Sequence, residues 1–155
     1  MDLTPVPSQV LPGSGQQLVA KAGEVINAGD AIYLNPATGK LNKASCASPA
    51  TGFDGIALHS VVAIGHPVHY AHAGQFTMGI GAAMHAGEVL VLSANLGKIA
   101  RAADLVNTNM LIMAGYCVSN TQIFLQIKAT GVTYNTAALL AADEGKAASE
   151  DAPPK

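Results

Sequence analysis

The sequence predicts a single, mostly-β domain, either a small β-sandwich or a β-barrel, and three observations lead to that fold class. Turn residues such as Gly, Pro and Asn recur roughly every 8–12 residues, which is typical of sandwiches and barrels of short strands. The body of the chain shows no long window with a helical hydrophobic period. One hairpin-like unit occurs twice. We therefore divide the 155 residues into an extended arm (1–16), a β domain (17–134) and a flexible, acidic, Ala-rich tail (135–155).

Residues 1–16 are predicted to be extended, because Pro5, Pro7 and Pro12 remove backbone donors and disfavour helix and central strand. The arm also carries apolar residues, which a purely solvated tail would not need. Two interpretations stay open: the arm packs on its own domain, or it reaches a neighbouring subunit. The second leads us to expect that deleting residues 1–14 leaves the β domain folded but weakens attachment to the partner. The candidate contact residues are Leu3, Pro5, Val6, Pro7, Val10 and Leu11.

A hairpin-like unit is repeated in residues 17–45 and 75–103, which align without a gap. Each copy contains an Ala-Gly-Asp or Ala-Gly-Glu turn, because Gly tolerates a positive φ and the acidic side chain bonds nearby backbone. A short strand, a loop that ends in Gly-Lys and a second strand follow in both copies. The sequence therefore predicts two related hairpins. The repeated turn positions are Gly29, Asp30, Gly39, Gly87, Glu88 and Gly97.

The remaining strands are predicted from alternating polar and apolar residues between turn signals. Alternation is clearest at 123–128, where Ile123, Leu125 and Ile127 would share one face. Helix is expected only as a turn or two at residues 136–142, and the rest of the tail has the composition of a disordered segment. Strands are expected at residues 17–20, 31–34, 55–60, 68–70, 75–78, 89–92, 110–118 and 123–128, and after Lys40 and Lys98.

The composition points to assembly with other chains. Charged residues make up 12% of the sequence, against roughly 25% in an ordinary soluble domain. A surface so poor in charge favours coverage by other copies, so we expect a homo-oligomer. The near-neutral body lacks the basic footprint of a nucleic-acid binder, and its apolar runs fall short of the ~20 residues of a membrane span. From the charge and the short apolar runs we expect neither a nucleic-acid nor a membrane partner. The start of the chain lacks a signal-peptide pattern, so we expect synthesis in the cytoplasm.

The sequence lacks the motifs of common catalytic sites. Neither a G-x-S-x-G elbow nor a Gly-rich phosphate loop is present. Cys46 lies in a loop-like stretch without a nearby base, and two cysteines do not make a metal cluster by themselves. We expect Cys46 and Cys117 to be small buried hydrophobic residues in a reducing compartment. The sequence therefore predicts a protein that is not an enzyme and has no cofactor.

Five histidines form the most conspicuous polar group: His59, His66, His69, His72 and His85. A zinc site needs three or four ligands on a rigid frame. On a strand, the spacing His66-x-x-His69-x-x-His72 would direct His69 away from the other two. We therefore predict loop and strand-end histidines rather than a metal site. A metal-binding protein that uses this cluster stays as an alternative.

A carrier module is a second alternative. Residues 22–33, AGEVINAGDAIY, are similar to the turns of lipoyl and biotinyl carrier domains. Those domains present a modifiable lysine at a hairpin tip. Here Lys40 and Lys98 follow glycines and lack the flanking residues of such a lysine. The carrier interpretation therefore ranks below a structural role.

A family resemblance rests on the segment from Lys21 to Met78, with the phrases G-I-A at 55–57 and G-H-P-V-H-Y at 65–70. This pattern resembles the head decoration (capsid cement) proteins of tailed phages over roughly residues 17–130. The resemblance implies a structural virion protein, made in the host cytoplasm, that binds the capsid exterior. It also implies trimers that clamp adjacent subunits of the major capsid protein. The C-terminal tail and the histidine cluster depart from the family pattern, so the resemblance gives them no role.

Overall fold

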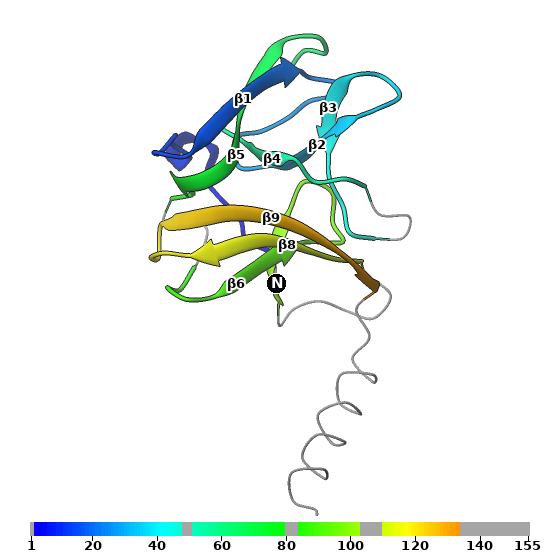
Figure 1. Ribbon diagram of the computed structural model, residues 1–155. Coiled ribbons are helices and arrows are strands. Elements are labelled where there is room, and N and C mark those ends of the chain that lie inside the picture. The colour runs from blue at the N-terminus through cyan, green and yellow to red at the C-terminus, as the bar shows by residue number, and fades with distance from the viewer. Residues whose placement is uncertain (1, 48–50, 80–83, 103–109, 134–155) are drawn as a thin grey trace, which may run out of the picture.

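The residues described by the computed structural model form one curled antiparallel sheet (Figure 1). The strands follow the order β3-β2-β4-β5-β9-β8-β6-β7, and β1 pairs with β5. The predicted mostly-β fold class is therefore confirmed. The described residues are 2–47, 51–79, 84–102 and 110–133. The strands are β1 (Gln16–Lys21), β2 (Ala31–Asn35), β3 (Lys40–Lys43), β4 (Gly55–Ala57), β5 (Pro67–Thr77), β6 (Val89–Leu92), β7 (Ile99–Arg101), β8 (Met110–Cys117) and β9 (Gln122–Thr133).

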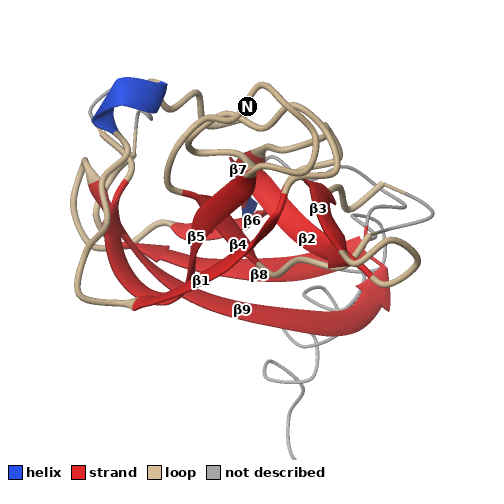
Figure 2. Ribbon diagram, turned by 90° about the horizontal axis from the view of Figure 1, so that it is seen from above, coloured by secondary structure: helices blue, strands red, loops and turns tan. Residues whose placement is uncertain are grey.

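Strand β5 joins two layers of the sheet. Its first part pairs with β1 and β4, and residues 74–77 pair with β9. The change of partner occurs at Gly74, whose φ is 91° and where a Cβ would collide with the backbone of Gly15. The strands expected at 68–70 and 75–78 are thus one bent strand, because a glycine here bends the strand without ending it. Seen from above, β8 and β9 lie across the layer that holds β1, β4 and β5 (Figure 2).

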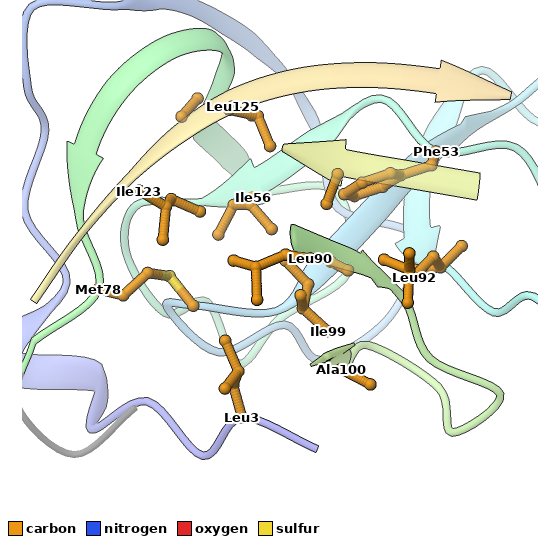
Figure 3. Packing of buried hydrophobic residues seen from close by; sticks show 14 of the residues in the cluster. Leu3, Phe53, Ile56, Met78, Leu90, Leu92, Ile99, Ala100, Ile123 and Leu125 are labelled. Atoms are coloured by element: carbon orange, nitrogen blue, oxygen red, sulfur yellow. The ribbon is translucent and has the colours of Figure 1, made fainter. Parts of the chain in front are cut away.

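The buried side chains form two clusters. The larger cluster lies between the layers, where Ile56 of the first layer meets Leu90 and Ile123 of the second (Figure 3). The smaller cluster fills the concave side of the first layer and includes Ile32 and Leu41. Aliphatic residues dominate both clusters, as expected for a chain without Trp. Ala22, directly after β1, forms an isolated parallel β-bridge with Leu41 on β3.

The same four-stranded unit occurs twice in the sheet. The first unit is β2-β3-β4-β5 and the second is β6-β7-β8-β9, and the sheet order places them end to end with β5 beside β9. Both hairpins pair in the same register. The equivalent pairs are Ile32↔Lys43 with Leu90↔Arg101, Tyr33↔Asn42 with Val91↔Ala100, and Leu34↔Leu41 with Leu92↔Ile99.

The equivalence continues into the two following strands. Gly55 on β4 and Gly115 on β8 both lie where a Cβ would collide with a neighbouring carbonyl oxygen, that of Ala71 and that of Phe124 respectively. The cross-strand rows on one face also correspond. They are Ala31–Ile56–Ala71 in the first unit and Val89–Tyr116–Phe124 in the second. The repeat seen in the sequence as two hairpins is thus a repeat of four strands in the structure.

The repeated turns have matching hydrogen bonds. Gly29 and Gly87 have φ values of 91° and 86°, which favour glycine. The carboxylate after each glycine accepts a backbone N–H three residues earlier: Asp30 from Asn27 at 2.8 Å, and Glu88 from His85 at 3.0 Å. The loop glycines Gly39 and Gly97 also correspond, with φ values of 69° and 75°.

The N-terminal arm lies along its own domain. The Leu3 N–H donates to the Ile99 carbonyl at 2.7 Å, and Leu11 exchanges two backbone hydrogen bonds with Thr77. Leu3 and Val10 belong to the larger buried cluster. Of the two interpretations, packing on the same domain therefore holds for these two residues. Because Leu3 and Val10 are buried, we now expect the removal of residues 1–14 to uncover part of the core and to destabilise the domain.

Two further expectations concern the ends of the chain. A short 3-10 turn (η1, Pro7–Gln9) interrupts the arm, which we expected to contain no regular element. The tail and the helical turn expected at residues 136–142 lie outside the described residues. Within the described residues, no helix has the length and apolar character needed to cross a membrane.

Candidate interaction surface

A row of apolar side chains lies open on the outer face of the second unit. Val89, Tyr116 and Phe124 are cross-strand neighbours on β6, β8 and β9. Val89 is 41% exposed and Tyr116 is 43% exposed. The Tyr116 and Phe124 rings stack, with centroids 5.4 Å apart and planes 19° apart. We call these three residues the outer row. The sequence predictions did not include it, because strand alternation does not tell which face is covered.

Two shallow grooves flank the outer row. One has a volume of about 350 Å³ and is lined in part by Met113, Ile127 and Lys128. The other, about 430 Å³, lies between β5 and β9 and is lined in part by His72 and Ile127. Gln126 lines both grooves, and Lys128 is the charged member of the linings. The apolar outer row therefore lies among polar side chains.

A second exposed apolar group lies at the loop between β4 and β5. Val62 is 84% exposed, and Ile64 and Val25 are also exposed. Ile26 and Val61 exchange backbone hydrogen bonds of 3.1 and 2.8 Å, which hold this loop beside the segment that contains Val25. We call Val25, Val62 and Ile64 the loop patch. In the arm, the exposed candidate residues are Val6, Pro7 and Leu11.

The structure separates the histidines into different environments. His59 Nε2 accepts the backbone N–H of His69 at 3.0 Å and lies 3.2 Å from His69 Nδ1. His72 Nδ1 donates to the Asp54 carbonyl at 2.7 Å. His66 is exposed in the turn before β5. Within the described residues, no three His, Cys, Asp or Glu side chains are grouped so that they could hold a metal ion.

The sequence did not indicate the contact between His59 and His69. The two residues come together because Leu58 continues the pairing of β4 with β5, its N–H donating to the His69 carbonyl at 2.9 Å. His59 is then directed across the strand end towards His69. The register of β4 on β5 would have been needed to find this pair.

The equivalent acids Asp30 and Glu88 have different electrostatic environments. Burial raises the pKa of Asp30, and the opposing effects of the Asn27 N–H and of Lys43 are smaller. Burial also acts to raise the pKa of Glu88, but the His85 N–H and the Arg101 guanidinium outweigh it, so this pKa is lowered. Glu88 Oε1 lies 3.1 Å from Arg101 Nε. The hydrogen bonds of the turns and the neighbouring charges account for the presence of both carboxylates.

The environments of the two cysteines and of the two candidate carrier lysines fit structural roles. Cys46 and Cys117 are free and buried, and burial raises the pKa of both thiols. Lys40 pairs with Asn35 in the hairpin ladder, so the residue lies at the base of the loop. The backbone carbonyl of Lys98 accepts the Ser93 N–H at 3.0 Å at the equivalent place. Neither lysine is at a hairpin tip, where a carrier domain presents its modified residue.

Comparison with protein-family models finds no matching family, and comparison with curated proteins finds no match.

Proposed function

We propose that this protein is a structural component of a tailed-phage head, which binds the outside of the capsid and clamps adjacent subunits of the major capsid protein. The observation that carries the proposal is the position of its exposed apolar residues. Val62 and Ile64 of the loop patch belong to the loop between β4 and β5, and the outer row lies on β6, β8 and β9 of the second layer. A small domain with exposed apolar residues on both layers can join two other surfaces.

The loop patch is the proposed capsid contact. Val62 and Ile64 project from a short loop, so they can enter a shallow depression between capsid subunits. Each apolar side chain contributes about 1.5–3 kcal/mol when it is fully buried. One copy would therefore bind weakly, and many copies on a shell, acting together, would bind well. With few charges involved, the attachment should depend only weakly on salt.

The test uses heads of the parent phage that lack the gene for this protein. We expect the purified protein to bind these heads, as seen by co-sedimentation and electron microscopy, and to raise the temperature at which they release DNA. The double substitution Val62→Asp and Ile64→Asp should abolish decoration, because it would bury two charges. Leu96→Asp adds a charge at another exposed residue and serves as the matched control. A wild-type protein that does not bind heads would contradict the proposed function.

A further inference from the structure

The pairing of β4 with β5 ends on a side chain. In an antiparallel sheet, two residues of a hydrogen-bonded pair exchange two N–H···O bonds. At the end of β4 the His69 carbonyl accepts the Leu58 N–H at 2.9 Å. The His69 N–H donates to Nε2 of the His59 ring at 3.0 Å, and the same Nε2 lies 3.2 Å from His69 Nδ1. One imidazole therefore holds the start of the following loop against β5.

These contacts fix the protonation state of the His59 ring. A ring nitrogen that accepts an N–H carries no proton, so His59 is neutral here and holds its proton on Nδ1. One added proton can be shared, with His59 Nε2 donating to His69 Nδ1. When both rings are protonated, neither nitrogen can accept, and two positive groups would lie 3.2 Å apart. The closed arrangement therefore excludes the doubly protonated pair.

The charged groups around the pair do not offset its positive charge. Lys21 on β1 lies on the same sheet face as His69, and His66 is exposed in the same loop. Asp54 precedes β4 and so lies at the opposite end of that strand, and the Glu24 carboxylate accepts hydrogen bonds from β3. Within the described residues, neither ring of the pair has an ion pair with a carboxylate.

We infer that His59 and His69 form a pH-sensitive latch, which is closed while His59 is neutral and opens when both rings are protonated. Histidine is the side chain that ordinarily changes its charge between pH 5 and 8, so mild acid is sufficient to open the latch. The other side of the loop is held separately by the backbone bonds between Ile26 and Val61. Opening therefore frees the start of the loop from β5 and leaves the rest of the domain folded.

The loop that the latch holds carries Val62 and Ile64 of the loop patch. Acid should thus loosen the residues proposed to contact the capsid, and attachment should weaken as the latch opens. This consequence rests on the proposed function, whereas the latch itself belongs to the free chain and is tested without capsid.

Nuclear magnetic resonance of the full chain, labelled with nitrogen-15, tests the latch in two ways. At pH 7.5 the ring nitrogen shifts should show His59 with its proton on Nδ1 and none on Nε2. The protection of the His69 amide against hydrogen exchange, taken relative to the intrinsic rate at each pH, should fall roughly 2–10-fold from pH 7.5 to pH 5. This is the change in population that one net hydrogen bond supports.

Two variants separate the latch from other histidines, and circular dichroism checks that both are folded. His59→Gln supplies an amide oxygen, an acceptor that does not titrate, so the protection of the His69 amide should no longer depend on pH. His66→Gln removes an exposed histidine of the same loop and should behave as the wild type. A His59 ring with its proton on Nε2 at pH 7.5 would overturn the inference. A His69 amide that is equally protected at both pH values, or a His59→Gln variant with the wild-type pH dependence, would also overturn it.

Discussion

Asp30 and Glu88 occupy equivalent turns, and each carboxylate accepts a backbone N–H three residues earlier. Their pKa values nevertheless move in opposite directions, because Asp30 is buried and Glu88 lies beside Arg101. At both sites this hydrogen bond satisfies a backbone N–H group of the turn. At Asp30 the negative charge has a cost from burial, whereas at Glu88 the charge is favoured by the neighbouring Arg101.

We predict that Asp30→Asn is at least as stable as the wild type at pH 7. The amide oxygen can still accept the Asn27 N–H, and the buried charge is gone. Asp30→Ala loses the acceptor as well and should cost about 0.5–1.5 kcal/mol. The free energy of unfolding, measured in urea for all three proteins, checks this. An Asn variant that loses as much as the Ala variant would show that the charge itself stabilises the turn.

The pH dependence gives a second readout of the same substitution. The pKa of Asp30 in the folded protein is raised above its ordinary value of 3.8. The stabilisation by the protonated form is therefore fully present below that value and is lost as the pH rises through the raised pKa. Wild type should gain stability relative to Asp30→Asn as the pH falls through this window. Glu88 acts in the opposite sense, since its lowered pKa gives stability that is lost on acidification.

At the scale of elements, each of the two four-stranded units contains a glycine at a position where a larger residue does not fit. At Gly55 and Gly115 the neighbouring strand approaches so closely that a Cβ would collide with its carbonyl oxygen. Because the same close approach occurs in both units, it is a property of the unit and not of one site.

We predict that Gly115→Ala and Gly55→Ala each destabilise the protein by roughly 1–3 kcal/mol, since the strands must move apart to admit the methyl group. Gly39→Ala is the control: its φ of 69° is also unfavourable, but no atom lies within 4 Å of the added Cβ. We expect it to cost about 1–2 kcal/mol or less. Unfolding in urea compares the three variants. A Gly115 variant as stable as the control would mean that β8 and β9 separate easily.

Hairpins and turns were predictable from the sequence, because Gly-Asp or Gly-Glu turns and Gly-Lys loops recur at fixed spacing. The repeat of β4 and β8 was not. Two more residues separate Leu90 from Gly115 than separate Ile32 from Gly55, so an alignment without gaps fails after the hairpins. The outer row was missed for a different reason. Alternation identifies two faces of a strand, but tertiary packing decides which one is covered.

At the scale of the whole molecule, the arm completes the second layer. The Leu3 N–H bonds to Ile99 on the edge strand β7, and the Asp2 carboxylate accepts hydrogen bonds from Ser93 and Asn95 in the β6–β7 loop. An edge strand left open offers a template for pairing with other chains, and the arm covers part of this edge.

The sequence predicted an extended, partly apolar arm but left its destination open. An extended segment with a few apolar anchors fits a groove on its own domain as well as one on a neighbour, because the local sequence does not specify the groove. The structure places Leu3 and Val10 in the domain core, whereas Val6 and Leu11 remain exposed. The last two therefore remain as candidate contacts to another subunit.

This division of the arm gives a test with a matched pair of leucines. Leu3 is 2% exposed and Leu11 is 54% exposed. Leu3→Ala should cost about 2–5 kcal/mol of unfolding free energy, because it empties part of the core. Leu11→Ala should change stability by no more than about 0.5 kcal/mol. Deleting residues 1–14 should destabilise at least as much as Leu3→Ala. Urea unfolding followed by circular dichroism gives all three values. If Leu3→Ala were as stable as Leu11→Ala, the arm would be free in solution, and its apolar residues would again be candidates for binding a neighbouring subunit.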